Sequence, residues 1–208
     1  MILFYYDKTF EGLLTALFDA YSRRQFPDHL RAVGEPAPMF TQVVHEVFTD
    51  REKAGRVWRA LEKKVPGYVC NMIMCVWLSE VEGSAELLLR YMRKLFDRQG
   101  GAFADFGDDD ILQMQKLARK VAYEGQRMRM FVRFQKAADG TFFAPVSPVH
   151  NALPLSLEYF RDRFADQRWL IYDTRRHYGY AYDLEEVREV TLDRDDDLIE
   201  GKLSDELM

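Results

Sequence analysis

Arginines and tyrosines lie among apolar residues in the stretch RWLIYDTRRHYGYAYD, at positions 168–183. In a strand ending near Asp183, the three tyrosines of YGYAY would share one face, because successive side chains of a strand point to opposite faces. Phenol rings beside guanidinium groups could stack on bases and bind phosphates. The same pattern also fits tyrosines that cover a core and arginines that face solvent. A nucleic-acid-binding surface of this kind would use Arg129, Arg133, Arg175, Arg176, Tyr178 and Tyr180.

Two further residues could transfer a proton. His150 lies in SPVHNALP, a proline-flanked loop between a predicted strand and a predicted helix, and loops often display functional residues. Its imidazole could act as a general acid or base, with Asp173 orienting or activating it. The alternatives are a histidine bonded to the backbone and a salt bridge from Asp173 to Arg175 or Arg176. The sequence therefore leaves open whether the protein is an enzyme.

Neither a metal site nor a cofactor is indicated. The other three histidines lack the spacing of metal ligands, and three consecutive aspartates at 108–110 suit the start of a helix better than an ion. Cys70 and Cys75 would point to different sides of one apolar helix, which predicts buried free thiols. The common phosphate-binding, dinucleotide-binding and hydrolase motifs are absent from the sequence.

To position these residues, the chain must first build helices and then strands. MILFYY predicts a short strand, and the apolar spacing that follows Thr9 predicts a helix. Prolines and a glycine predict a loop over 27–40, after which helices resume. One helix should open with a capping box from Thr49 to Glu52, an apolar helix should lie near 68–79, and another should start at Ser84.

The second part of the chain predicts a sheet. Alternation in RMRMFVRFQ predicts a strand over 128–135, and Asp139 with Gly140 predicts a hairpin turn before TFFAPV. A short helix with Ser156 as N-cap comes next, followed by strands in RWLIYD, HYGYAYD and VREVTL. The fold class is α+β, with an N-terminal strand and helices followed by a mainly antiparallel sheet that carries a short inserted helix.

Composition and charge describe one domain with an acidic end. The 208 residues are 48% hydrophobic and 14% aromatic, enough for one core, so we expect a single domain over 1–192 and a tail over 193–208. The net charge is −5, but residues 183–208 carry −8 and residues 1–182 carry +3. Residues 112–182 hold 12 basic and 6 acidic side chains. The charge of the body therefore suits an anionic partner better than the total suggests.

The N-terminal residues and the apolar runs predict a cytoplasmic protein without a membrane segment. The most apolar run, VPGYVCNMIMCVWL, has 14 residues, fewer than the roughly 20 that span a bilayer. The N-terminus has no basic segment and no cleavage site of a secretory signal.

Several segments together resemble a known family. YDKTFEGLLTALFDAY, YEGQRMRMFVRF, FAPVSPVHNALP, YFRDRF and IYDTRRHYGYAYD are similar, in this order, to a bacterial family labelled "probable DNA metabolism protein". The resemblance implies a radical SAM companion thought to modify or repair DNA, and a uracil-DNA glycosylase domain fused to some members. This chain lacks the three-cysteine motif of the companion, and the resemblance transfers no catalytic residue.

Three functions follow as expectations. The first is a nucleic-acid-binding accessory protein in DNA repair or modification that works with a radical SAM partner. The second is an enzyme acting on nucleic acid or nucleotides through His150 and Asp173. The third is a scaffold that contacts only proteins, through its tyrosines and its acidic tail.

Overall fold

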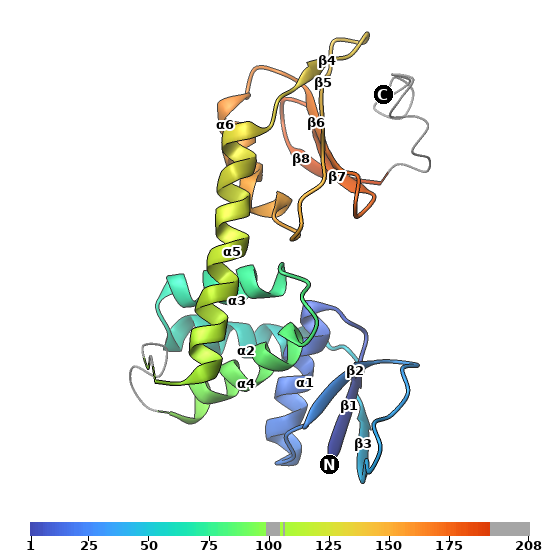
Figure 1. Ribbon diagram of the computed structural model, residues 1–208, viewed down its shortest axis with the longest axis vertical. Coiled ribbons are helices and arrows are strands. Elements are labelled where there is room, and N and C mark those ends of the chain that lie inside the picture. Colours follow the sequence, from blue (N-terminus) through green and yellow to red (C-terminus); the bar gives the residue numbers. More distant parts are fainter. Residues whose placement is uncertain (99–104, 106, 192–208) are drawn as a thin grey trace. The chain divides into compact units, whose positions relative to one another are not determined.

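The computed structural model of the chain describes residues 1–98, 105 and 107–191 (Figure 1). By their contacts the residues fall into two compact units, Met1–Arg119 and Lys120–Met208. The predicted α+β class is confirmed, since helices accompany a three-stranded and a five-stranded sheet. The single domain expected over 1–192 stays a prediction, and the tail at 193–208 lies outside the described residues.

The first unit contains a parallel sheet that the sequence analysis missed. β1 (Ile2–Tyr6) is the central strand, with β2 (His29–Ala32) on one side and β3 (Val43–Glu46) on the other. β2 lies in the predicted loop over 27–40, and β3 lies where helices were expected, so both expectations were wrong. β2 and β3 each have only four residues and are stabilised by pairing with β1. A local stretch of sequence does not show such pairing.

Helices pack beside this sheet and supply most of the core of the first unit. They are α1 (Phe10–Arg23), α2 (Arg51–Lys64), α3 (Gly67–Trp77), α4 (Ser84–Asp97) and the first part of α5 (Asp109–Phe131). α1 follows Thr9 as expected, and Thr9 caps it, because its hydroxyl accepts a hydrogen bond from the Gly12 N–H. Asp50, not Thr49, caps α2, since the Thr49 hydroxyl donates to Asp7 instead (2.7 Å).

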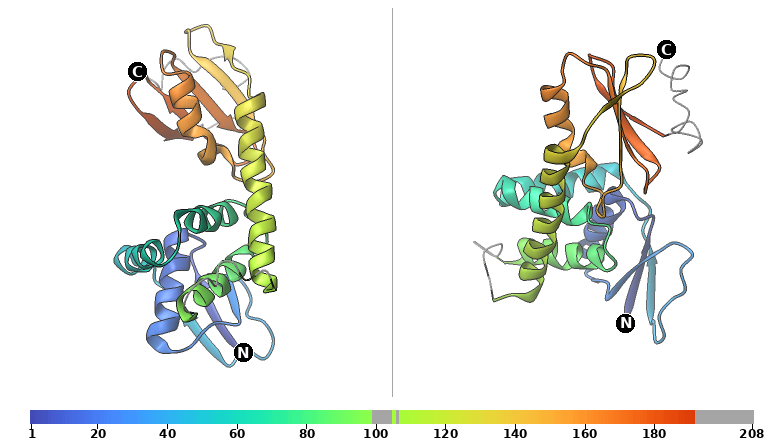
Figure 2. Two further views of the ribbon diagram at one scale, coloured as in Figure 1. Left: turned by 90° about the vertical axis from the view of Figure 1, so that its left-hand side faces the viewer. Right: turned by 45° about the horizontal axis from the view of Figure 1, so that its top comes forward.

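The second unit contains the predicted mainly antiparallel sheet, in the order β4-β5-β6-β7-β8. Its strands are β4 (Gln135–Lys136), β5 (Phe142–Val146), β6 (Trp169–Asp173), β7 (Tyr178–Tyr182) and β8 (Val187–Val190). Only β5 and β6 are parallel, and the chain between them forms η2 (Leu153–Ser156) and α6 (Leu157–Arg163). Figure 2 shows α6 against one face of this sheet, where Phe160 packs on Trp169. A parallel pair needs such a crossover connection.

The predicted strand over 128–135 is wrong, because α5 continues to Phe131 and only Gln135 and Lys136 pair with β5. Met128 and Val132 pack into the core of the second unit, and their spacing of four residues also fits one side of a helix. Met130 would share the buried side of a strand with Met128, yet it is 65% exposed. No proline or glycine follows Gly125 to end the helix before Phe131.

Two turn predictions in the second unit have different outcomes. The hairpin turn is confirmed, since Gly140 has φ +90° and Asp139 accepts from the Thr141 N–H (2.9 Å). Ser156 occupies the predicted N-cap position of α6, but its hydroxyl makes no capping hydrogen bond, because it donates to the Gly125 carbonyl (3.0 Å).

No helix in the described part of the chain has the length and apolar character needed to cross a membrane. The same residues contain no group of three His, Cys, Asp or Glu side chains that could hold a metal ion.

Candidate nucleic-acid interface

Asp173 ends β6 as a buried carboxylate with three hydrogen-bond donors. Its side chain is fully buried and accepts from the backbone N–H groups of Arg175 (2.9 Å) and Arg176 (3.2 Å). The Arg176 guanidinium completes the set with an ion pair of 2.9 Å. The salt bridge expected for Asp173 therefore forms with Arg176, while the side chain of Arg175 is exposed. These donors therefore occupy the oxygens with which the Asp173 carboxylate could have acted as a base.

Arg176 also holds the loop that carries His150. Its guanidinium donates to the carbonyls of Pro148 (3.1 Å) and Val149 (2.9 Å). From the other direction, the Glu124 carboxylate of α5 accepts from the N–H groups of Val149 (2.6 Å) and His150 (2.8 Å). Two charged side chains thus fix the backbone on both sides of this loop, and charge-assisted bonds of this kind are about twice as strong as neutral ones.

His150 and Asp173 are therefore linked through one arginine. Asp173 pairs with Arg176, and Arg176 binds the two residues that precede His150. The His150 side chain is half-buried. Glu124 was not predicted as a site residue, although it is the single acidic residue between positions 111 and 138.

Tyr178 and Tyr180 are half-buried, and burial raises the pKa of both phenol groups. The Tyr178 hydroxyl donates to the Asn151 side chain, and its ring meets the ring of Tyr180 edge to face, with centroids 5.6 Å apart. Burial is the main reason that the pKa of Tyr178 lies well above its usual value. Burial, together with the charge of nearby Glu189, raises the pKa of Tyr180 to about 12. Both hydroxyls are therefore hydrogen-bond donors at neutral pH.

The tyrosine stripe of β7 faces the core of the second unit. Tyr182 is 7% exposed and packs on Trp169, with ring centroids 5.5 Å apart, and Tyr180 contacts the same core. The register pairs Ile171 with Tyr180 and Asp173 with Tyr178, and both of these tyrosines are half-buried. Tyr182 therefore covers the core, as one of the two interpretations of the sequence expected. Tyr178 and Tyr180 fit that interpretation only in part.

The predicted arginines come from separate elements. Arg129 lies in the last turn of α5, Arg133 follows that helix, and Arg175 and Arg176 lie in the turn between β6 and β7. Arg129 and Arg133 are exposed, but neither is on a strand.

The end of α5 displays a basic and aromatic surface, of which Met130 and Phe131 lie in the stretch where a strand was expected. In the part of α5 that belongs to the second unit, exposed residues follow one another at intervals of three, four and three positions, which places them on one side of the helix. Tyr123, Met130 and Phe131 are each between 63% and 65% exposed. We call this surface the α5 face: Lys120, Tyr123, Arg127, Met130 and Phe131.

The acidic residue that lies among the cations of the α5 face in the sequence is engaged elsewhere. Glu124, the acidic residue of this stretch, is bound to the amides of the 149–150 loop. Among the residues that the structure describes, no ion pair involves Lys120, Arg127, Arg129 or Arg133. Unpaired cations beside exposed rings are the composition that binds phosphates and stacks on bases.

Comparison with known proteins gives one match. The model of a family described as "Domain of unknown function (DUF4130)" matches residues 82–201, which include all the elements of the second unit. No curated protein and no solved structure matches the chain.

Proposed function

The chain belongs to the DUF4130 family of domains of unknown function, and we propose that it binds nucleic acid as an accessory protein in DNA repair or modification. The observation that carries this proposal is the α5 face, with its unpaired cations and its exposed ring and apolar side chains. The label "probable DNA metabolism protein" and the radical SAM partner come from the resemblance of the sequence. We propose that the bound strand is handed to that partner.

Single-stranded nucleic acid fits the α5 face better than duplex. Tyr123 and Phe131 can stack on unpaired bases, and base stacking on an aromatic ring contributes about 1–3 kcal/mol per base. Lys120, Arg127 and the nearby Arg133 supply cations for the phosphates. We therefore expect single strands to bind more tightly than a duplex of the same length.

Fluorescence anisotropy of labelled single-stranded and duplex DNA at several salt concentrations tests the proposal. The association constant should fall steeply with salt, and each lost phosphate contact should reduce the log–log slope by about 0.7 for single strands. Arg127→Ala with Arg133→Ala should weaken binding and flatten that slope. Arg161→Ala is the matched control, because Arg161 is exposed on α6 and already pairs with Asp162 (2.9 Å). Absence of binding at low salt, or an equal loss in the control, would refute the proposal.

A nucleic-acid or nucleotide-processing enzyme is the second candidate. The observation in its favour is the network in which Arg176 joins Asp173 to the loop before His150. In this version His150 transfers the proton, and Asp173 acts as a positioning residue through Arg176, since its own oxygens already accept three hydrogen bonds. Cleavage or deamination of a bound oligonucleotide that disappears in His150→Ala, with binding retained, would establish it.

A protein scaffold without nucleic-acid contact is the third candidate, favoured by the exposed Met130 and Phe131. Both side chains are of types enriched in protein interfaces. Co-purification with the radical SAM partner that survives Arg127→Ala but fails in Phe131→Ala, in a protein that binds no DNA, would select it.

A further inference from the structure

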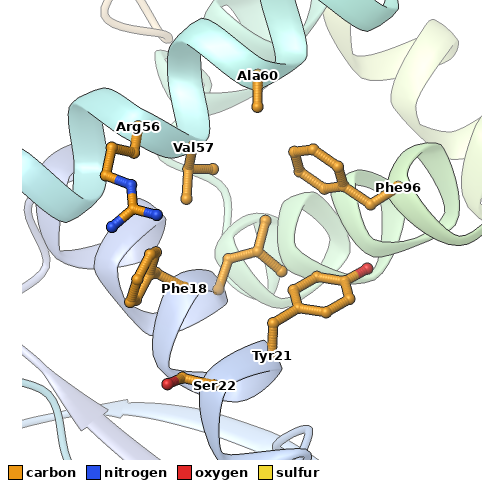
Figure 3. Close-up of a pocket in the computed structure, with 8 residues that line it drawn as sticks. Phe18, Tyr21, Ser22, Arg56, Val57, Ala60 and Phe96 are labelled. Carbon is orange, nitrogen blue, oxygen red and sulfur yellow. The ribbon is translucent and has the colours of Figure 1, made fainter.

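The first unit contains a pocket with aromatic walls. Its volume is about 480 Å³, and its lining residues come from α1, α2 and α4 (Figure 3). The rings of Phe18, Tyr21 and Phe96 form much of the wall, together with Val57 and Ala60. Tyr21 and Phe96 meet edge to face with centroids 5.9 Å apart. A pocket of this size and character is typical of sites for small planar ligands.

The polar groups of the pocket favour an anion. Of the lining residues, all in the described part of the chain, none is acidic and one, Arg56, is basic. Figure 3 shows the Arg56 side chain beside Phe18, where its guanidinium lies 5.1 Å from the ring centroid. The Tyr21 hydroxyl is not available to a ligand as a donor, because it donates to Asp97 (2.7 Å).

A second cation near the pocket is already neutralised. The Lys53 ammonium lies 5.5 Å from the same Phe18 ring, but it pairs with Asp19 at 2.9 Å. Asp19 also accepts from His45 (3.0 Å). Arg56 has no acidic partner among the residues that the structure describes, and it is the cation that lines the pocket, so it is the one placed to bind a ligand there.

We infer that this pocket binds a small molecule with a planar aromatic ring and one anionic group, a carboxylate or a phosphate. The ring lies between Phe18, Tyr21 and Phe96, and the anion bonds to the Arg56 guanidinium, which can offer two parallel N–H donors. A nucleotide base with its phosphate and an aromatic acid share this chemistry. The inference does not depend on nucleic-acid binding, since every residue in it belongs to the first unit.

Calorimetric titration of the full chain with three naphthalene probes tests the inference. We use 2-naphthoate, 2-naphthyl phosphate and the neutral 2-naphthamide, which share one ring system. At least one anion should bind about tenfold more tightly than the amide, as expected for a charge-assisted bond. The tighter of the two anions assigns the natural class as a carboxylate or a phosphate.

Three variants locate the site. Arg56→Ala should remove the preference for the anion and leave the weak binding of the amide. Ala60→Trp should block all three probes, because the indole fills the pocket from an exposed position of α2. Arg59→Ala is the control, since Arg59 is an exposed arginine of the same helix that does not line the pocket.

The outcomes separate clearly once circular dichroism shows that each variant is folded. Anion binding that is lost in Ala60→Trp, loses its preference in Arg56→Ala and persists in Arg59→Ala supports the site. Failure of the unaltered protein to bind any probe overturns it, as does binding that Ala60→Trp leaves unchanged. DNA binding through the α5 face is measured separately, so either proposal can fail alone.

Discussion

Replacing Arg176 by alanine should destabilise the second unit far more than replacing its neighbour Arg175. Arg176→Ala removes the cation that pairs with the fully buried Asp173 and the donor to the carbonyls of Pro148 and Val149. Removing one partner of a buried ion pair costs about 3–5 kcal/mol. Asp173 keeps two backbone N–H donors, so we expect a cost of about 2–4 kcal/mol. Arg175→Ala should cost about 0.5 kcal/mol or less, because its side chain is exposed.

Urea unfolding followed by circular dichroism measures this difference, and hydrogen exchange localises it. The amides of Val149 and His150 bind Glu124 and lie next to the carbonyls that Arg176 holds, so they should exchange faster in Arg176→Ala. A double variant with Asp173→Asn should be destabilised by less than the sum of the single variants, because it removes the uncompensated charge.

Two results would refute this reasoning. One is an Arg176→Ala protein as stable as Arg175→Ala. The other is a destabilised protein in which the amides of Val149 and His150 exchange at the original rate, since the loop would then not depend on the arginine. Additive effects in the double variant would show that the ion pair contributes little.

Three further predictions concern backbone packing, charge and the loop. Gly179→Ala should destabilise the second unit by about 1–3 kcal/mol in urea unfolding, since an added Cβ would overlap the Ile171 carbonyl oxygen. An unchanged unfolding midpoint would contradict this close approach of the two strands. The hydrogen bond from Lys94 to Asp108 (2.6 Å) lowers the pKa of the Asp108 carboxyl below its usual 3.8. The stability that this hydrogen bond adds is therefore present at neutral pH, and it is lost as the pH falls below about 4 and the carboxyl is protonated. Lys94→Met should therefore flatten the stability curve between pH 7 and pH 3, and parallel curves would rule the contribution out. Glu124→Gln should lower the free energy of unfolding by about 1–2 kcal/mol and raise the hydrogen-exchange rates of the Val149 and His150 amides. The reason is that a glutamine side chain has one acceptor oxygen, whereas the carboxylate uses two. Unchanged exchange rates would contradict this prediction.

Local signals in the sequence predicted much of the second unit. The Asp139 and Gly140 turn, the apolar strand WLIYD and the alternation around Gly179 each carry their own structural preference. The salt bridge of Asp173 was also foreseeable, because its partner lies three residues away. These features depend on near neighbours, which a sequence displays directly.

Features that depend on distant residues were not predicted. β2 and β3 are ordered by β1, and Glu124 binds amides 25 and 26 residues further along the chain. The excess of basic residues is visible in the sequence, but Arg129 lies on α5, where a strand over 128–135 was expected. An alternating pattern of eight residues also fits a helix when residues four apart are apolar, and only the packed core distinguishes the two.

The bonds of Glu124 imply a thermodynamic linkage between the 149–150 loop and the α5 face. Glu124 lies four residues after Lys120 and three before Arg127, spacings at which oppositely charged side chains of a helix attract each other. When the loop detaches, the released carboxylate would neutralise these cations and compete with phosphates for them. Docking of the loop and capture of an anionic ligand should therefore favour each other reciprocally, so that ligand binding slows the opening of the segment that presents His150.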